Sequence, residues 1–223
     1  MRHARRTIFR LFFVMACMWF GAAQAATPEE SFNFFRAVQM DDARTVQALL
    51  GKGLDPNAKN PVGGEPALVA AVREGSMQVL EVLLANPSTN IEVNALNGNT
   101  ALMMAAFKHN KPALMALLNK GAAVDRQGWT ALHYAAAAGD DEIARILLQR
   151  GARIDAVSPP ASGLYTPLML AAREGRHSTA QLLIEQGANP RLKNSEDLTA
   201  AQIAERAGQA ALSSAIEAQA KGR

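Results

Sequence analysis

Apolar and polar positions recur along this 223-residue chain with a period near 33 residues. Five short segments share one pattern, a threonine or proline followed by apolar residues and alanine, and they start at residues 66, 100, 130, 166 and 199. Seventeen residues after each start comes a second apolar mark, of which Leu117-Leu118 is an example. Counting back from Leu49-Leu50 places a sixth start near Phe32. A period of this length is typical of solenoids, in which each unit packs on its neighbours.

Each repeat is predicted to form two short helices joined by a turn. The apolar stripe of one such pair is too small to be stable alone, so the pairs must stack, and abundant alanine lets neighbouring helices approach closely. Glycines lie at the turn between the two helices, as at Gly75, Gly139 and Gly175. Threonine suits a helix N-cap because its hydroxyl accepts an unpaired backbone N–H. The candidate caps are Thr100, Thr130, Thr166 and Thr199.

Together these positions resemble the ankyrin repeat. The resemblance lies in the Thr-x-Leu opening and its alanine, the glycine in mid-repeat, the paired leucines and the Gly-Ala exit seen at Gly151-Ala152. It implies an all-α solenoid of about six helix-turn-helix repeats, linked by finger loops that resemble β-hairpins. The expected boundaries are a signal peptide at 1–25, a short lead at 26–30, the ankyrin-repeat domain at 31–220 and a tail at 221–223.

Three departures from the family pattern stand out. The finger loop that leads into the fourth repeat is shortened, and residues 158–163 extend the next one with a Pro-rich, non-helical loop. His109 stands where the family has glycine, so the resemblance does not by itself establish the geometry of that turn. The first and last repeats carry charged residues on their outer sides and look like caps.

The first 25 residues have the layout of a secretory signal peptide. An apolar run from Leu11 to Phe20 is followed by the small-residue exit Ala23-Gln24-Ala25, which predicts cleavage after Ala25 and a periplasmic or secreted protein. The basic start precedes this run and comprises Arg2, Arg5, Arg6 and Arg10.

Two other interpretations of this segment stay open. A retained membrane anchor is one, although the stretch from Leu11 to Ala23 falls short of the roughly 20 residues that a spanning helix needs. A bacterial lipoprotein is the other, because Val14-Met15-Ala16-Cys17 resembles a lipobox and would leave a lipidated Cys17 as the first residue. Met15 fits that box poorly.

Charge and cysteine content exclude two classes of protein. The full chain has a net charge of +3, but without residues 1–25 it has 23 − 4 = 19 basic residues against 20 acidic ones, a net charge of −1. The basic balance that would suggest nucleic-acid binding therefore belongs to the predicted signal peptide. A single cysteine excludes a disulfide scaffold within the chain.

The sequence contains no motif typical of an enzyme or a metal site. There is no Gly-x-Ser-x-Gly elbow, phosphate-binding glycine loop or His-Glu-x-x-His pair. His109, His133 and His177 belong to different repeats and none has metal-ligand spacing to another. His133 occupies a position where the family resemblance implies a structural ring that ties neighbouring turns by hydrogen bonds. We expect no catalysis, no cofactor and no metal.

The expected functional feature is a surface. The resemblance implies that a protein partner is held by the concave side, which is built from finger tips and the exposed ends of the first helices. Aromatic and arginine side chains dominate many interfaces, and Phe107, Trp129 and Tyr165 fall on one side in three consecutive repeats. Alternatively, these rings cover gaps between fingers and helices. By register, the predicted surface comprises Glu65, Arg73, Glu74, Asn97, Asn99, Phe107, Lys108, Gln127, Trp129, Tyr165, Arg173, Glu174, Leu198 and Arg206.

The sequence therefore predicts an exported, non-catalytic scaffold that binds an unknown protein partner and no nucleic acid. Three alternatives remain: a factor that stabilises another periplasmic enzyme, a secreted effector that binds a host protein, and a lipid-anchored envelope protein. The sequence does not distinguish among them, because a repeat scaffold presents a variable surface on a constant fold.

Overall fold

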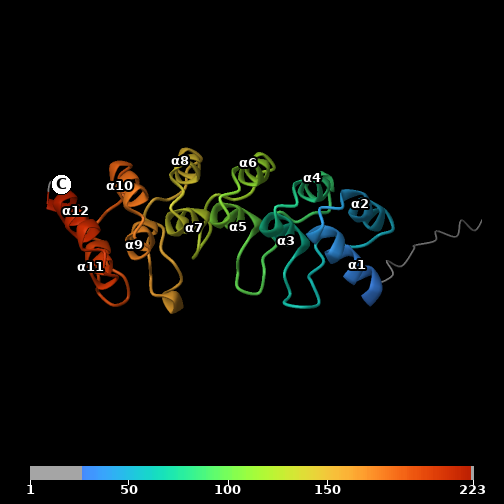
Figure 1. Ribbon diagram of the computed structural model, residues 1–223, viewed down its shortest axis with the longest axis horizontal. Coiled ribbons are helices and arrows are strands. Elements are labelled where there is room, and N and C mark those ends of the chain that lie inside the picture. The colour runs from blue at the N-terminus through green and yellow to red at the C-terminus, as the bar shows by residue number, and fades with distance from the viewer. Residues whose placement is uncertain (1–26, 222–223) are drawn as a thin grey trace, which may run out of the picture.

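The computed structural model describes residues 27–221, which form six helix pairs stacked in a gently curved row (Figure 1). The inner helices lie side by side in one layer and are α1 (Pro28–Gln39), α3 (Ala67–Glu74), α5 (Ala101–Phe107), α7 (Ala131–Ala138), α9 (Pro167–Arg173) and α11 (Ala200–Arg206). The outer helices form the second layer and are α2 (Ala43–Gly51), α4 (Met77–Ala85), α6 (Lys111–Asn119), α8 (Asp141–Gln149), α10 (His177–Glu185) and α12 (Ala210–Lys221). The predicted all-α solenoid of about six repeats is confirmed.

The predicted signal peptide at 1–25, its cleavage site after Ala25 and the candidate lipidation site Cys17 all lie outside the described residues. Within 27–221, no helix is long and apolar enough to cross a membrane.

Local capping explains where most inner helices begin. The hydroxyls of Thr100, Thr166 and Thr199 each accept a hydrogen bond from the backbone N–H three residues further on, at 3.4, 3.3 and 3.4 Å. Helix α1 begins at Pro28, before the start expected near Phe32, because Thr27 and Glu30 form a capping box of their own there. The first repeat therefore has a longer inner helix than the others.

The turn between the two helices uses a left-handed residue in every repeat. His109 keeps the family's turn geometry, since its φ of 55° lies in the same region as the glycines. A non-glycine residue there costs about 1 to 2 kcal/mol, and the hydrogen bond from His109 to Asp140 offsets part of that cost. The six left-handed positions are Asp41, Gly75, His109, Gly139, Gly175 and Gly208.

One hydrophobic core runs the length of the row, from Phe34 in α1 to Ile216 in α12. Alanines of the inner helices, such as Ala105 and Ala135, are fully buried, which lets adjacent inner helices pack closely. The substantial helix contacts join the two helices of one repeat or helices of neighbouring repeats. Each helix pair is therefore stabilised mainly by the pairs beside it.

The finger loops project from the inner layer on the side opposite the outer helices (Figure 1). Three of them are closed by isolated antiparallel bridges, Lys59 to Pro66, Asn94 to Thr100 and Lys193 to Thr199. In the extended loop, a short 3-10 helix spans Pro160–Ser162 and the amide of Ser158 donates to the carbonyl of Tyr165 at 2.9 Å.

Side chains at the base of each finger also join one repeat to the next. Glu92 accepts a hydrogen bond from the N–H of Ala123 at 2.8 Å, and Asp155 accepts from the N–H of Asn189 at 3.0 Å. Equivalent bonds run from the amide of Asn90 to Asn57 and from the amide of Arg153 to Asp125. These bonds hold the fingers in register, so that the surface between fingers and inner helices has a defined shape.

Candidate functional site

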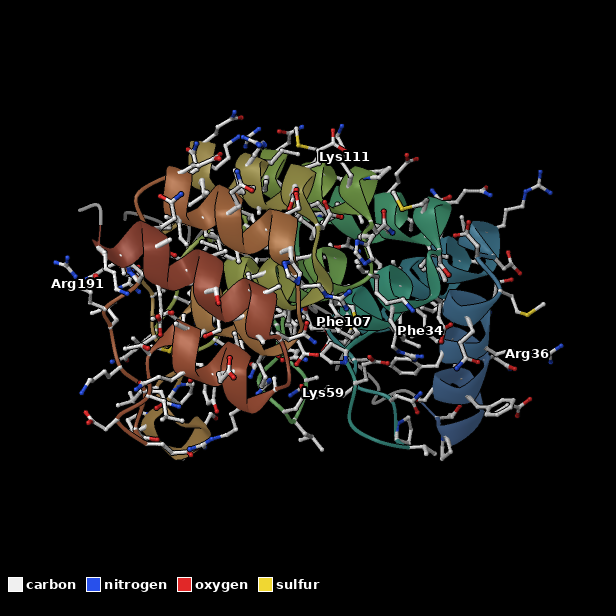
Figure 2. The ribbon with its side chains drawn as sticks, turned by 60° about the vertical axis from the view of Figure 1, so that its left-hand side comes forward. Phe34, Arg36, Lys59, Phe107, Lys111 and Arg191 are labelled. Carbon is white, nitrogen blue, oxygen red and sulfur yellow. The ribbon has the colours of Figure 1, made fainter. Side chains whose placement is uncertain are left out.

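A cavity of about 450 Å³ opens between α5, α7 and α9 on the inner side of the central repeats. Its apolar part comes from three rings and small or aliphatic residues, and its polar part from two arginines, two histidines and a glutamate. Phe107, at the end of α5, lies at the level of the inner layer, whereas Lys111 lies with the outer helices (Figure 2). The lining residues are Phe107, His109, Trp129, His133, Tyr134, Ala137, Ala138, Leu170, Arg173, Glu174 and Arg176.

Aromatic rings form a connected cluster at this cavity. The ring of Tyr134 meets Phe107 edge to face, with centroids 6.1 Å apart, and lies 6.3 Å from the ring of Trp129. The hydroxyl of Tyr134 donates to the side-chain oxygen of Asn99 at 2.5 Å, which fixes the ring from the adjacent finger. Burial raises the pKa of Tyr134, and this hydrogen bond opposes the shift. Half of Phe107 stays exposed, so the cluster presents apolar surface to solvent.

Beneath Trp129, His133 is fully buried and has hydrogen bonds at both ring nitrogens. Its Nε2–H donates to the carbonyl of Tyr165 at 3.0 Å, and its Nδ1 accepts from the backbone N–H of Thr130 at 3.2 Å. The Thr130 hydroxyl lies 2.9 Å from the same Nδ1. The bond to Tyr165 links the fourth repeat to the fifth. Burial lowers the pKa of His133 to about 4, so the ring is neutral at pH 7.

The extended loop adds a cation–π pair at the edge of the cavity. The guanidinium of Arg173 lies 5.3 Å from the centroid of the Tyr165 ring, and its Nε donates to Glu174 at 2.9 Å. The Tyr165 amide is held by the hydroxyl of Ser158 at 2.9 Å, so the ring is positioned by the closed loop.

The structure brings together only part of the surface predicted from the sequence. Phe107, Trp129, Arg173 and Glu174 line the cavity, while Asn99 and Tyr165 adjoin it through Tyr134 and Arg173. Lys108 follows Phe107 and is exposed.

The remaining predicted residues lie away from the cavity. Arg73 forms a bidentate ion pair with Glu65, with Nε–Oε1 and Nη2–Oε2 distances of 3.0 and 2.8 Å, and also contacts Glu74. Hydrogen bonding to Glu65 raises the pKa of Arg73, consistent with a satisfied pair. Arg206 pairs with Glu196 in the last repeat, and Leu198 packs against the core. Asn97 accepts from the amide of Asn99, and Gln127 is an exposed finger residue.

Sequence reasoning missed Tyr134 and Arg176, together with the small floor residues Ala137 and Ala138. Tyr134 was detectable, because residues three and four positions apart share one face of a helix and the predicted helix places Tyr134 above those two alanines. Arg176 had no such signal. It enters from the start of α10, where its Nε donates to the carbonyl of Ala137 at 3.0 Å across the repeat boundary.

The polar side chains that line the cavity belong to arginine, histidine, glutamate and tyrosine. None of its lining residues is a serine, threonine or cysteine that would serve as a nucleophile. Within the described part of the chain, no three His, Cys, Asp or Glu side chains come close enough together to hold a metal ion.

Comparison with protein families identifies the repeats. A family model described as ankyrin repeats in three copies matches residues 34–106 and 68–158, and a single ankyrin-repeat model matches residues 164–195. Together the matches cover most of the chain and include all the elements that line the cavity.

Relatives and a solved structure agree with that assignment. The chain is 34% identical over 206 residues to Protein glp-1 of Caenorhabditis elegans and 31% identical over 160 residues to the human transient receptor potential cation channel subfamily A member 1. These alignments cover 85% and 68% of this chain but only 16% and 14% of the relatives. The structure resembles the ankyrin repeat domain of Bcl-3 with a TM-score of 0.68 and 26% identity, over 83% of this chain and 81% of that one.

Proposed function

This chain belongs to the ankyrin-repeat family, whose repeats serve as scaffolds for protein–protein interaction, and from that premise we propose that it binds a protein partner through the concave surface of its central repeats. The observation that carries the proposal is the aromatic cluster at the cavity between α5, α7 and α9. Partly exposed rings with an adjacent arginine are the side chains that most often contribute binding energy at interfaces.

We also propose that the protein has no catalytic activity of its own. The buried histidine of the cavity, His133, has both ring nitrogens in hydrogen bonds to the backbone, so it has no free nitrogen for proton transfer. His109, the more exposed one, lies 2.9 Å from Asp140, and no serine, threonine or cysteine stands among the lining residues. This arrangement supports binding through shape and apolar contact.

Replacing Trp129 and Tyr165 together by alanine is expected to lower partner affinity about tenfold or more, because two rings of the concave surface are removed. The measurement uses the purified chain as bait in fractionated extracts of the source organism. Proteins captured by the wild type are identified by mass spectrometry, and binding of the purified partner is then measured by calorimetry.

The matched control changes two exposed outer-helix residues, Gln78 in α4 and Arg145 in α8, to alanine. This double variant is expected to bind the partner as the wild type does, and circular dichroism checks that both variants keep their helices. If both variants retain full capture, the concave surface is not the binding site.

For its location we propose that the protein acts outside the cytosol after removal of residues 1–25. The basic start, the short apolar run and the Ala23-Gln24-Ala25 exit support export, and loss of Cys17 with the signal would leave no thiol to oxidise.

The expected intact mass is that of a chain beginning at Ala26, isolated from the periplasmic fraction or the culture medium. Detection of a chain that begins at a lipidated Cys17 would replace this proposal by the lipoprotein alternative. An intact Met1 in the cytosolic fraction would refute export. The mass of the same protein made without residues 1–25 provides the reference.

A further inference from the structure

Arg176 is the one cation at the cavity with no acidic partner within the described residues. Arg173, the other lining arginine, pairs with Glu174, and His109 pairs with Asp140. The Arg176 side chain makes a single hydrogen bond, from Nε to the carbonyl of Ala137, and forms no ion pair with any residue of 27–221. Its side chain is exposed at the mouth of the cavity.

The charge of the lining residues follows from these pairings. Among the lining residues, two arginines and one glutamate contribute a net charge of 2 − 1 = +1. Asp140 lies behind His109, and its other side-chain oxygen accepts from the amide of Ile143 at 2.9 Å. The mouth therefore favours a carboxylate from outside, and arginine favours it especially because a guanidinium can make two parallel hydrogen bonds to one carboxylate.

Next to this cation, the apolar part of the cavity favours an aromatic side chain. Phe107, Trp129 and Tyr134 offer ring edges and faces, while Ala137 and Ala138 leave room at the floor. At about 450 Å³ the space lies at the low end of volumes typical of small-molecule sites. It accommodates a short peptide segment rather than a whole helix.

Resting on the proposed binding function, we infer that the cavity anchors an exposed acidic–aromatic segment of the partner protein. An aromatic side chain enters the cavity against Phe107, Trp129 and Tyr134, and a neighbouring carboxylate pairs with Arg176. The rings supply affinity through buried apolar area, and the carboxylate supplies selectivity.

The test uses a blocked pentapeptide of sequence Gly-Glu-Phe-Glu-Gly, whose two glutamates place a carboxylate on either side of the ring. It is titrated into the isotopically labelled full chain, and dissociation constants are obtained from NMR shifts. The shifts are expected at residues 101–107, 131–138 and 167–173 and at the indole N–H of Trp129. The matched peptide Gly-Gln-Phe-Gln-Gly is expected to bind about fivefold more weakly, as for one partly exposed ion pair.

Variants then assign that difference to one side chain. In Arg176→Gln, which keeps a hydrogen-bond donor, the two peptides are expected to bind equally, whereas Arg176→Lys retains part of the preference. Arg145→Gln on outer helix α8 makes the same chemical change at a distance and is expected to keep the full difference. Thermal unfolding of each variant confirms that the fold is kept.

Two results overturn the inference: shifts confined to another part of the chain, or a preference for the glutamate peptide that persists in Arg176→Gln. Capture of the natural partner separates this failure from failure of the proposed function. If the Trp129 and Tyr165 variant loses capture but the Arg176 variant does not, the concave binding site is supported and the acidic–aromatic specificity is refuted. If capture needs none of them, the binding proposal itself falls.

Discussion

Leu132→Ala is expected to lower the free energy of unfolding by about 2 to 5 kcal/mol, because it leaves a cavity in the most central part of the core. Leu132 is fully buried in α7, and that inner helix packs on α5 on one side and α9 on the other. The loss therefore weakens contacts to both neighbouring repeats. Urea denaturation followed by circular dichroism measures the change.

Leu96→Ala is the matched control, since the same atoms are removed at a finger tip where the side chain is 80% exposed. Its expected effect lies within about 0.5 kcal/mol. Equal effects at the two leucines would contradict the packing described for α7.

Acidification from pH 7 to pH 5 is expected to destabilise the protein by about 2 kcal/mol through His133 alone, rising to about 3 kcal/mol at pH 4. Burial lowers the folded-state pKa of His133 to about 4, below its ordinary value of 6.5. Between these two values the unfolded chain binds a proton that the folded chain does not, so stability falls as pH falls. Above pH 6.5 both states are neutral and the contribution is complete.

His133→Gln isolates this contribution, because glutamine does not titrate yet offers a donor and an acceptor. The variant is expected to be less stable than the wild type at pH 7, where its shorter side chain loses the bonds to Thr130 and Tyr165. Its free energy of unfolding should change about 2 kcal/mol less than that of the wild type between pH 7 and pH 5. Parallel pH profiles for the two proteins would refute a neutral, buried His133.

Local features of the fold were predictable from the sequence because they depend on neighbouring residues. A threonine that precedes an apolar helix satisfies that helix's own backbone, which is why Thr100, Thr166 and Thr199 cap as expected. The left-handed turn at His109 was less predictable. Its backbone follows the other repeats because stacking imposes the turn, and the contact to Asp140 lies 31 residues away.

The candidate site was only partly predictable for a related reason. The repeat length fixes which positions of neighbouring repeats lie side by side, and this register places Phe107 and Trp129 near one another. The direction of a side chain across a repeat boundary has no such signal, and Arg176 reaches the carbonyl of Ala137 from 39 residues away. Register also places Arg73 and Glu65 of the second repeat on the predicted binding surface. In the structure these two side chains pair with each other, which the repeat register does not reveal.

Neighbour-only stacking has a consequence for how such a chain changes length. No substantial helix contact joins the first helix pair of the described residues to the last, so nothing in the row requires a particular number of units. Duplication of one whole period would lengthen the row and add a stripe to its inner surface without rebuilding a central core. Insertion of half a period would instead add one helix without its partner helix. We therefore expect the chain to tolerate insertion of whole repeats only.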